Sequence, residues 1–276
     1  MTKSIVLQSH RSPLPCSWIA HCLASVRDWC VLNHYDYHFM GDALFDWVPA
    51  DLLRKTQVQR VVATDLARLL VLQNALNDGY DMAIWLDADF LVFNPAQFVI
   101  PDETFALGRE VWVQYDKQGK LKVYKKVHNA FLMFRKANCF LDFYADTAQR
   151  LLAQNQGTMP PQFIGPKLLT ALHNTAVLPV MEVAGMLSPL VIKDVIKGGG
   201  GALDLFVAHS QKPIAGANLC ISSCENNAVS NNEMKQLITL LLDNAALVPA
   251  DMADRVAHET DKYAVTTALQ TLSKLE

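Results

Sequence analysis

The hydrophobic pattern of the first 95 residues alternates short apolar runs with longer amphipathic segments. Short runs bounded by turn residues predict strands, and an apolar residue at every third or fourth position predicts a helix. The expected strands cover residues 4–8, 35–40 and 83–93, and the expected helices cover 17–32 and 65–76, with an irregular link over 44–55. This alternation predicts an α/β fold in which a mixed, mainly parallel sheet is flanked by helices on both faces.

The pattern is less regular after residue 95. We expect strands at 105–115, 121–126, 129–135 and 203–208, and helices at 137–154 and 163–174. The four glycines at 198–201 fit either a mobile loop over a site or a plain connection. We favour the connection, because no lysine and no expected helix follows as a phosphate-binding loop requires. Residues 1–230 are predicted to form the main domain, and residues 231–276 a helical appendage of two amphipathic helices. The apolar sides of these helices are expected to pack on the main domain, and a homodimer contact is the less favoured alternative.

Composition limits the classes of partner. A chain of 276 residues with 51% hydrophobic content is long enough to bury a large core. Its formal charge of −3, and the lack of an evident Lys/Arg cluster, argue against a nucleic-acid partner. The N-terminus has no signal-peptide pattern and no run reaches membrane-spanning length, so we expect a cytoplasmic protein without a transmembrane segment. The six cysteines form no C-x-x-C pair and are predicted to be free thiols.

Two carboxylates, Asp87 and Asp89, interrupt an apolar run that extends from Ala83 to Phe93. In one extended strand they would share a face, and neighbouring buried charges of like sign require a cation. Oxygen-only ligands suit Mg²⁺ or Mn²⁺, which keep coordination positions for substrate phosphates. The pattern therefore predicts a metal and diphosphate site. The alternative is that both aspartates merely end the strand, and we prefer the metal site because the next turn signal, Asn94-Pro95, comes five residues later.

Several segments together resemble a known family. Residues 64–81 and the Asp87-Ala88-Asp89 strand look like the core of nucleotide-sugar-dependent glycosyltransferases with the GT-A fold, which is Rossmann-like. Residues 129–135 are similar to that family's Asn-Ala-Gly strand, with Phe131 in place of the usual glycine. Residues 162–166 and 209–213 resemble the acceptor-side turn and the segment of the C-terminal metal histidine. The resemblance covers residues 4–215 and is strongest between 60 and 95.

The resemblance implies roles for individual residues. Asp65 and Arg68 would help to hold the donor sugar and the metal-site loop, and Gln8, His10 and Arg11 would contact the nucleotide base and ribose. Asp89 would hold the ion, with Asp87 acting directly or through water and the ribose. His209 is the candidate third ligand, since it follows the expected strand at 203–208 and precedes Lys212, whose ammonium would meet the diphosphate. Asn129 or Gln162 would lie beneath the anomeric carbon if the transfer retains configuration.

The expected function is transfer of a sugar from a nucleoside diphosphate sugar, with a UDP-sugar as first choice, to a glycan or other small-molecule hydroxyl acceptor. An inverting transferase needs a carboxylate base near the acceptor hydroxyl, and the sequence singles out none. Retention of configuration at the anomeric carbon is therefore favoured, and inversion stays open. A sugar nucleotidyltransferase ranks second, because the segment after the first strand lacks the glycine-rich basic loop of that class. A haloacid-dehalogenase phosphatase is disfavoured, because that class has a threonine shortly after its D-x-D pattern and Phe90-Leu91-Val92 follows the pattern here. A non-catalytic carbohydrate-binding protein would have no use for a diphosphate site.

Overall fold

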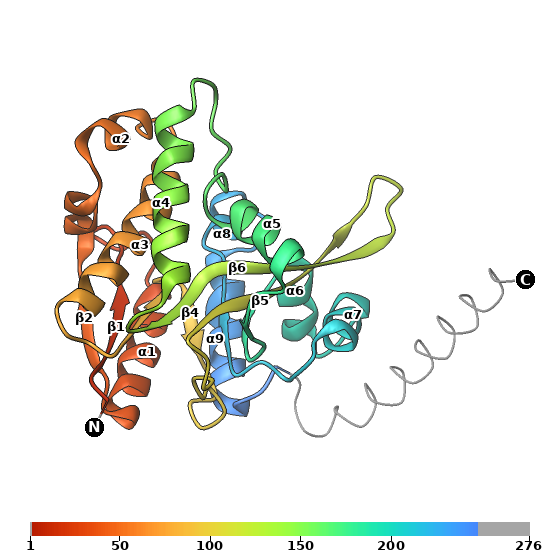
Figure 1. The fold of residues 1–276 in the computed structure, drawn as a ribbon. Coiled ribbons are helices and arrows are strands. Elements are labelled where there is room, and N and C mark those ends of the chain that lie inside the picture. Colours follow the sequence, from red (N-terminus) through yellow and green to blue (C-terminus); the bar gives the residue numbers. More distant parts are fainter. Residues whose placement is uncertain (1, 248–276) are drawn as a thin grey trace, which may run out of the picture.

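The computed structural model describes residues 2–247. Its centre is a six-stranded sheet with the order β2-β1-β3-β6-β5-β7 (Figure 1). The strands are β1 (Ser4–Gln8), β2 (Asp36–Phe39), β3 (Met82–Leu86), β5 (Phe105–Tyr115), β6 (Leu121–Arg135) and β7 (Val180–Met181). Strand β1 is parallel to β2 and β3, and β7 is parallel to β5, while β6 is antiparallel to both β3 and β5. The predicted α/β class with a mixed sheet is confirmed.

Helices cover both faces of this sheet because its strands are apolar on both sides. Ile5 and Leu7 of β1 point into one core cluster and Val6 into another, as the two-residue period of a strand requires. The first cluster is covered by α2 (Ala50–Lys55), α3 (Arg60–Asn77), α4 (Cys139–Gln154) and α5 (Pro166–Ala176). The second is covered by α1 (Ile19–Asn33). The predicted first strand, the first helix and the end of α3 at Asn77 agree with the structure.

A second, smaller sheet continues the chain beyond β3. Its order is β4-β9-β8, formed by β4 (Phe90–Val92), β8 (Ala184–Met186) and β9 (Gly216–Asn218). The chain therefore leaves the large sheet at Leu86 and enters the small sheet at Phe90. The three residues between them form a junction between two sheets, and the predicted single strand over 83–93 is wrong.

A third core cluster lies at the far end of β5 and β6. Here α6 (Pro189–Lys197), α7 (Gly201–His209) and α9 (Asn231–Asn244) pack with Trp18 and with Val111 and Val113 of β5. The remaining elements are the 3-10 helix η1 (Gly41–Trp47) and α8 (Ser222–Glu225). The first predicted helix of the C-terminal appendage is α9, whose Met234, Leu237 and Leu241 are fully buried in this cluster. The second lies outside the described residues, so the predicted domain division stays a prediction.

Four further expectations about local structure are wrong. The link at 44–55 contains η1 and α2, and residues 121–135 form one continuous strand, β6. Asp65 lies inside α3 rather than at its start. The apolar run at 203–208 is part of helix α7, which begins at the last of the four glycines, Gly201. The acidic side chain of Asp194 accepts hydrogen bonds from Ala202 N (2.8 Å) and Leu203 N (3.2 Å), so the N-terminus of α7 already has an anionic partner.

The cysteines and the helices bear on two predictions made from the sequence. All six cysteines are free, with Cys22 and Cys30 buried. Within residues 2–247, no helix has the length and apolar content needed to cross a membrane.

Candidate functional site

The Asp87-Ala88-Asp89 segment is a turn at the carboxyl end of β3. Phe90 N donates to Asp87 O (3.0 Å), which closes the turn before β4 begins. The turn signal therefore coincides with the carboxylates and does not follow them. In sheets with parallel strands, ligands bind beyond the carboxyl ends of the strands, and β3 is parallel to β1 at this point. Both aspartates occupy such a position.

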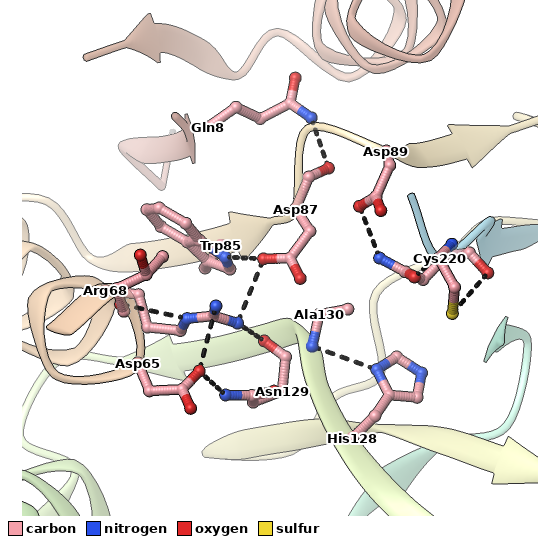
Figure 2. Close-up of polar contacts among 12 residues, drawn as sticks. Gln8, Asp65, Arg68, Trp85, Asp87, Asp89, His128, Asn129, Ala130 and Cys220 are labelled. Atoms are coloured by element: carbon pink, nitrogen blue, oxygen red, sulfur yellow. Dashed lines mark hydrogen bonds and ion pairs between the residues drawn. The ribbon is translucent and has the colours of Figure 1, made fainter. Parts of the chain in front are cut away.

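Arg68 of α3 holds the Asp87 carboxylate in place. Its side chain is 4% exposed, and Nη1 lies 3.1 Å from Asp87 Oδ1 and donates to Asn129 O at 2.7 Å. The same Asp87 oxygen accepts from Trp85 Nε1 (2.7 Å), and the guanidinium lies 5.3 Å from the centre of the Trp85 ring (Figure 2). A planar group with several donors can satisfy these partners together, which a lysine cannot do.

A second carboxylate completes the surroundings of Arg68. Asp65, one turn earlier on α3, is 3.2 Å from Arg68 Nη2 and accepts from Asn129 Nδ2 (2.7 Å). Burial raises the pKa of Asp65 to about 6, although Arg68 and Asn129 favour its charged form. The backbone of Gly165 closes over this group, since a Cβ on Gly165 would lie 2.4 Å from Asp65 Oδ2 and 2.7 Å from Asn129 Nδ2. Glycine is therefore required for the close approach.

Gly165→Ala should disrupt this contact. We expect a loss of about 1–3 kcal/mol in the free energy of unfolding, measured by urea denaturation, because the added methyl group overlaps buried polar atoms that are hydrogen-bonded to each other. Gly157→Ala is the matched control, since nothing lies within 4 Å of its added Cβ. Equal stability of the two variants would contradict the close packing of Gly165 against Asp65 and Asn129.

Asp89 is held from the small-sheet side. Its residue is 8% exposed, Oδ1 accepts from Asn218 Nδ2 (2.8 Å) and Oδ2 accepts from Ile221 N (2.8 Å). Burial and then the charge of Asp87 raise the pKa of Asp89 to about 6. Figure 2 shows the two side chains leaving the same turn, Asp87 towards Arg68 and Asp89 towards Cys220. The two carboxylates thus interact electrostatically while each has its own fixed partners.

The charge balance of this cluster favours a cation. The charges of three carboxylates, those of Asp65, Asp87 and Asp89, act on the guanidinium of Arg68, so negative charge is in excess when all are ionised. Asp87 and Asp89 offer hard oxygen donors of the type that Mn²⁺ and Mg²⁺ prefer, and Asp87 is 26% exposed. Within residues 2–247, no group of three or more His, Cys, Asp or Glu is arranged to hold a metal. The donor set fits an ion with few protein ligands.

His128 is a buried site residue that the sequence did not indicate. It is fully buried on β6, where Nδ1 accepts from Ala130 N (3.2 Å) and Nε2 lies 3.2 Å from Ala184 O. The first contact requires an unprotonated Nδ1, so Nε2 carries the hydrogen and donates to Ala184. The ring fills the space beside Gly108, where a Cβ would lie 2.0 Å from His128 Cε1. An isolated glycine within a predicted strand was the available sequence signal.

Burial lowers the pKa of His128 to about 4, from an ordinary value of 6.5. The unfolded chain therefore takes up a proton before the folded protein does, and stability is lost as pH falls through this range. We expect His128 to contribute a loss of roughly 3 kcal/mol between pH 7 and pH 4. Asp65 and Asp89 act with the opposite sign, since their pKa values are raised.

The contribution of His128 is measured by comparing wild type with His128→Gln at each pH. Urea denaturation of the variant should show a smaller fall in unfolding free energy on acidification. Parallel pH profiles would show that the buried imidazole is not the group responsible.

The other residues predicted to contact the donor or the acceptor differ in how exposed they are. Gln8 is fully buried, and its amide donates to Asp87 O (3.0 Å) and accepts from Tyr37 Oη (3.0 Å), so it supports the turn from within. Arg11 is exposed and His10 is half-buried just beyond β1. Gln162 is exposed in the turn before α5. Their predicted contacts with donor or acceptor stay predictions.

The two predicted C-terminal site residues, His209 and Lys212, lie at the end of α7 and just after it. His209 is exposed at the end of α7, where Nδ1 lies 2.9 Å from Leu205 O, and Lys212 is exposed just after it. The structure does not bring His209 together with Asp87 and Asp89 in a three-ligand group. The apolar segment before His209, predicted as a strand, is the helix α7. Its role as a ligand, and the diphosphate contact of Lys212, stay predictions.

Comparison with known proteins gives similar structures only. No protein-family model and no curated protein matches the chain. A glycosyltransferase involved in the glycosylation of the major capsid of PBCV-1 is similar at a TM-score of 0.46 and 11% identity, over 84% of this chain and 99% of that one. The galactosyltransferase LgtC, in complex with donor and acceptor sugar analogs, is similar at 0.46 and 12%, over 90% and 98%. An active-site mutant of LgtC gives 0.43 and 10%, over 86% and 95%. These values alone assign no activity to the chain.

Proposed function

We propose that this chain is a glycosyltransferase that moves a sugar from a nucleoside diphosphate sugar, in the first instance a UDP-sugar, to a hydroxyl group of a glycan or other small acceptor. One observation carries the proposal, namely the acidic turn at the carboxyl end of β3. There Asp87 is fixed by Arg68 and Trp85, and Asp89 by Asn218 and Ile221. The family resemblance of residues 64–89 supports the same activity.

Asp87 and Asp89 would hold a Mn²⁺ or Mg²⁺ ion in this site. When bound, such an ion supplies Lewis-acid neutralisation of the departing diphosphate. Arg68 fixes the orientation of the Asp87 carboxylate. The side-chain amide of Gln8 donates to the backbone carbonyl of Asp87 and fixes the turn itself. Asn218 and Ile221 N orient Asp89 from the opposite side. The chain thus prearranges its two acidic groups, so little side-chain reorganisation is needed on binding.

The candidate for the uncharged group beneath the anomeric carbon is Gln162 rather than Asn129. The Asn129 Nδ2 donates to Asp65, and the residue is only 5% exposed. Gln162 is exposed and lies three residues before Gly165, whose backbone contacts the Asp65 and Asn129 pair. Retention of configuration follows if Gln162 occupies that place.

The test is release of nucleoside diphosphate from a panel of nucleotide sugars, without acceptor and with Mn²⁺, Mg²⁺ or chelator. We expect slow, metal-dependent release from at least one donor. A parallel assay supplies nucleoside triphosphate and sugar 1-phosphate and follows pyrophosphate, the product of a nucleotidyltransferase. Pyrophosphate release without hydrolysis of any nucleotide sugar would replace the proposed function with that second class.

A further inference from the structure

The β5–β6 hairpin projects from the body of the molecule (Figure 1). One of its faces packs on the third core cluster through Val111, Val113, Leu121 and Val123. Residues opposite each other in an antiparallel pair point to the same face, so the register defines the other face as well. That outer hairpin face consists of the cross-strand pairs Glu110–Lys126, Trp112–Tyr124 and Gln114–Lys122.

The outer hairpin face combines aromatic rings with positive charge. Trp112 and Tyr124 are both half-buried and directly opposite each other. The ammonium groups of Lys122 and Lys126 lie 5.3 Å and 5.6 Å from the centre of the Tyr124 ring. Trp112 Nε1 donates to Gln114 Oε1 (3.0 Å), which fixes the indole on this face. The result is an aromatic surface formed by Trp112 and Tyr124, with the ammonium groups of Lys122 and Lys126 close to the Tyr124 ring.

Positive charge is concentrated along this hairpin. Residues 116–126 contain five lysines and one acidic residue, although the whole chain has a formal charge of −3. The expectation that the chain has no Lys/Arg cluster is therefore wrong at this place. The cluster consists of Lys117, Lys120, Lys122, Lys125 and Lys126. A local excess of this kind attracts an anionic ligand.

The outer hairpin face leads to the candidate site. Side chains on one face of β6 recur every second residue, so Lys122, Tyr124 and Lys126 are followed by His128. The charge of Asp87 acts on His128, although burial dominates its pKa. On β5, Glu110 is near Cys220, since burial and then the charges of Asp89, Glu110 and Asp87 raise the pKa of that thiol. Ala130 connects His128 with the acidic turn, since Ala130 N donates to His128 Nδ1 (3.2 Å) and Ala130 O accepts from Asp87 N (2.9 Å).

We propose that the outer hairpin face binds the acceptor, and that the acceptor is an anionic saccharide, with a sugar ring packed on Trp112 and Tyr124 and its carboxylate or phosphate paired with Lys122 and Lys126. This inference rests on the proposed function. The C–H face of a sugar ring is apolar and matches an aromatic surface, while its hydroxyl groups need nearby polar partners. Lysine ammonium groups pair with either kind of anion as point charges.

An anionic lipid surface is the alternative partner, and the hairpin fits it less well. The tip between Tyr115 and Leu121 contains Asp116, two lysines, a glutamine and a glycine, so it offers no apolar wedge. The Trp112 and Tyr124 rings lie instead along the strands, between the tip and His128. An acceptor must approach the donor site, and the strand face that carries these rings continues towards His128.

Isothermal titration calorimetry with three saccharides tests the proposal. The probes are a hyaluronan oligosaccharide with carboxylates, mannose 6-phosphate with a phosphate, and uncharged chitotriose. Wild type should bind at least one anionic probe more tightly than chitotriose, with an affinity that falls as salt rises. Two double variants, Trp112→Ala with Tyr124→Ala and Lys122→Gln with Lys126→Gln, should each weaken that binding by about tenfold or more. Trp47→Ala and Lys235→Gln, at exposed positions elsewhere, are the matched controls.

The titration contains no nucleotide, so its failure is separate from failure of the donor assay. Unchanged affinity in the lysine variant, whose substitutions are on the surface, would overturn the proposal even if the aromatic variant did not fold. Equal binding of chitotriose and the anionic probes would also overturn it. Binding of phosphatidylglycerol vesicles without binding of either anionic saccharide would assign the hairpin to a lipid surface instead.

Discussion

Asp89→Asn should abolish metal-dependent release of nucleoside diphosphate, with a loss of about 10²-fold or more, because several kcal/mol of transition-state stabilisation depend on the bound ion. The fold should survive. The substitution removes one hydrogen bond, with Asn218 or Ile221, at a cost of about 1–3 kcal/mol. It also removes a buried charge whose pKa is raised to about 6 by burial and by Asp87, which offsets that cost.

The same carboxylate gives the activity a pH dependence. A raised pKa means that Asp89 becomes protonated as pH falls below about 6, and a protonated carboxyl group is a poor ligand. Metal affinity should therefore fall on that side of neutrality. Asp28→Asn, at an exposed position on α1, is the matched control and should keep full activity. If Asp89→Asn retained metal-dependent turnover, or lost activity only by unfolding, the aspartate would be a structural residue of the turn.

Arg68→Ala should cause the largest loss of stability, about 3–5 kcal/mol, because it leaves Asp65 and Asp87 without their cation in a buried setting. Urea denaturation at pH 7 measures this loss. Arg68→Lys should recover only part of it, since an ammonium group cannot contact Asp65, Asp87 and Asn129 O in one plane. Donor turnover should decrease in both variants as Asp87 loses its orientation.

Arg150→Ala is the control for loss of an arginine ion pair. Arg150 Nε lies 2.9 Å from Asp146 Oδ2, but the two side chains are 72% and 60% exposed. A surface pair of this kind contributes about 0–1 kcal/mol. If Arg68→Ala and Arg150→Ala had similar effects on the free energy of unfolding, the contacts of Arg68 with Asp65 and Asp87 would not be a buried, stabilising network.

The strands and helices with clear local signals were predictable. Residues 4–8 form β1 as expected, and α3 ends at Asn77, before the Asp78-Gly79 turn. The errors occurred where a short apolar run was ambiguous. Residues 83–93 are apolar on both sides of the turn, because β3 and β4 are each buried in a different sheet. Residues 203–208 are apolar without a clear period, so a buried helix could not be distinguished from a strand.

The site was only partly predictable for a similar reason. Asp65 and Arg68 are three residues apart on one helix, so their contact follows from helical spacing. Asn218 is 129 residues from Asp89, and no local pattern connects a short apolar segment near residue 217 with the acidic turn. His128 and Gly108 meet only because β5 and β6 pair with an irregularity between Leu107 and Gly108. Such partners are determined by tertiary topology rather than by nearby sequence.

Binding of Mn²⁺ to the acidic turn is the most direct measurement of the central claim. The electron paramagnetic resonance signal of free Mn²⁺ is followed as wild type, Asp89→Asn or Asp28→Asn is added, with and without UDP. We expect wild type and Asp28→Asn to reduce the free signal strongly in the presence of UDP and only weakly without it, because Asp87 and Asp89 supply few of the ligands that the ion needs. Asp89→Asn should leave the signal unchanged. Equal loss of signal with wild type and Asp89→Asn, or no loss with wild type and UDP, would contradict a metal and diphosphate site at this turn.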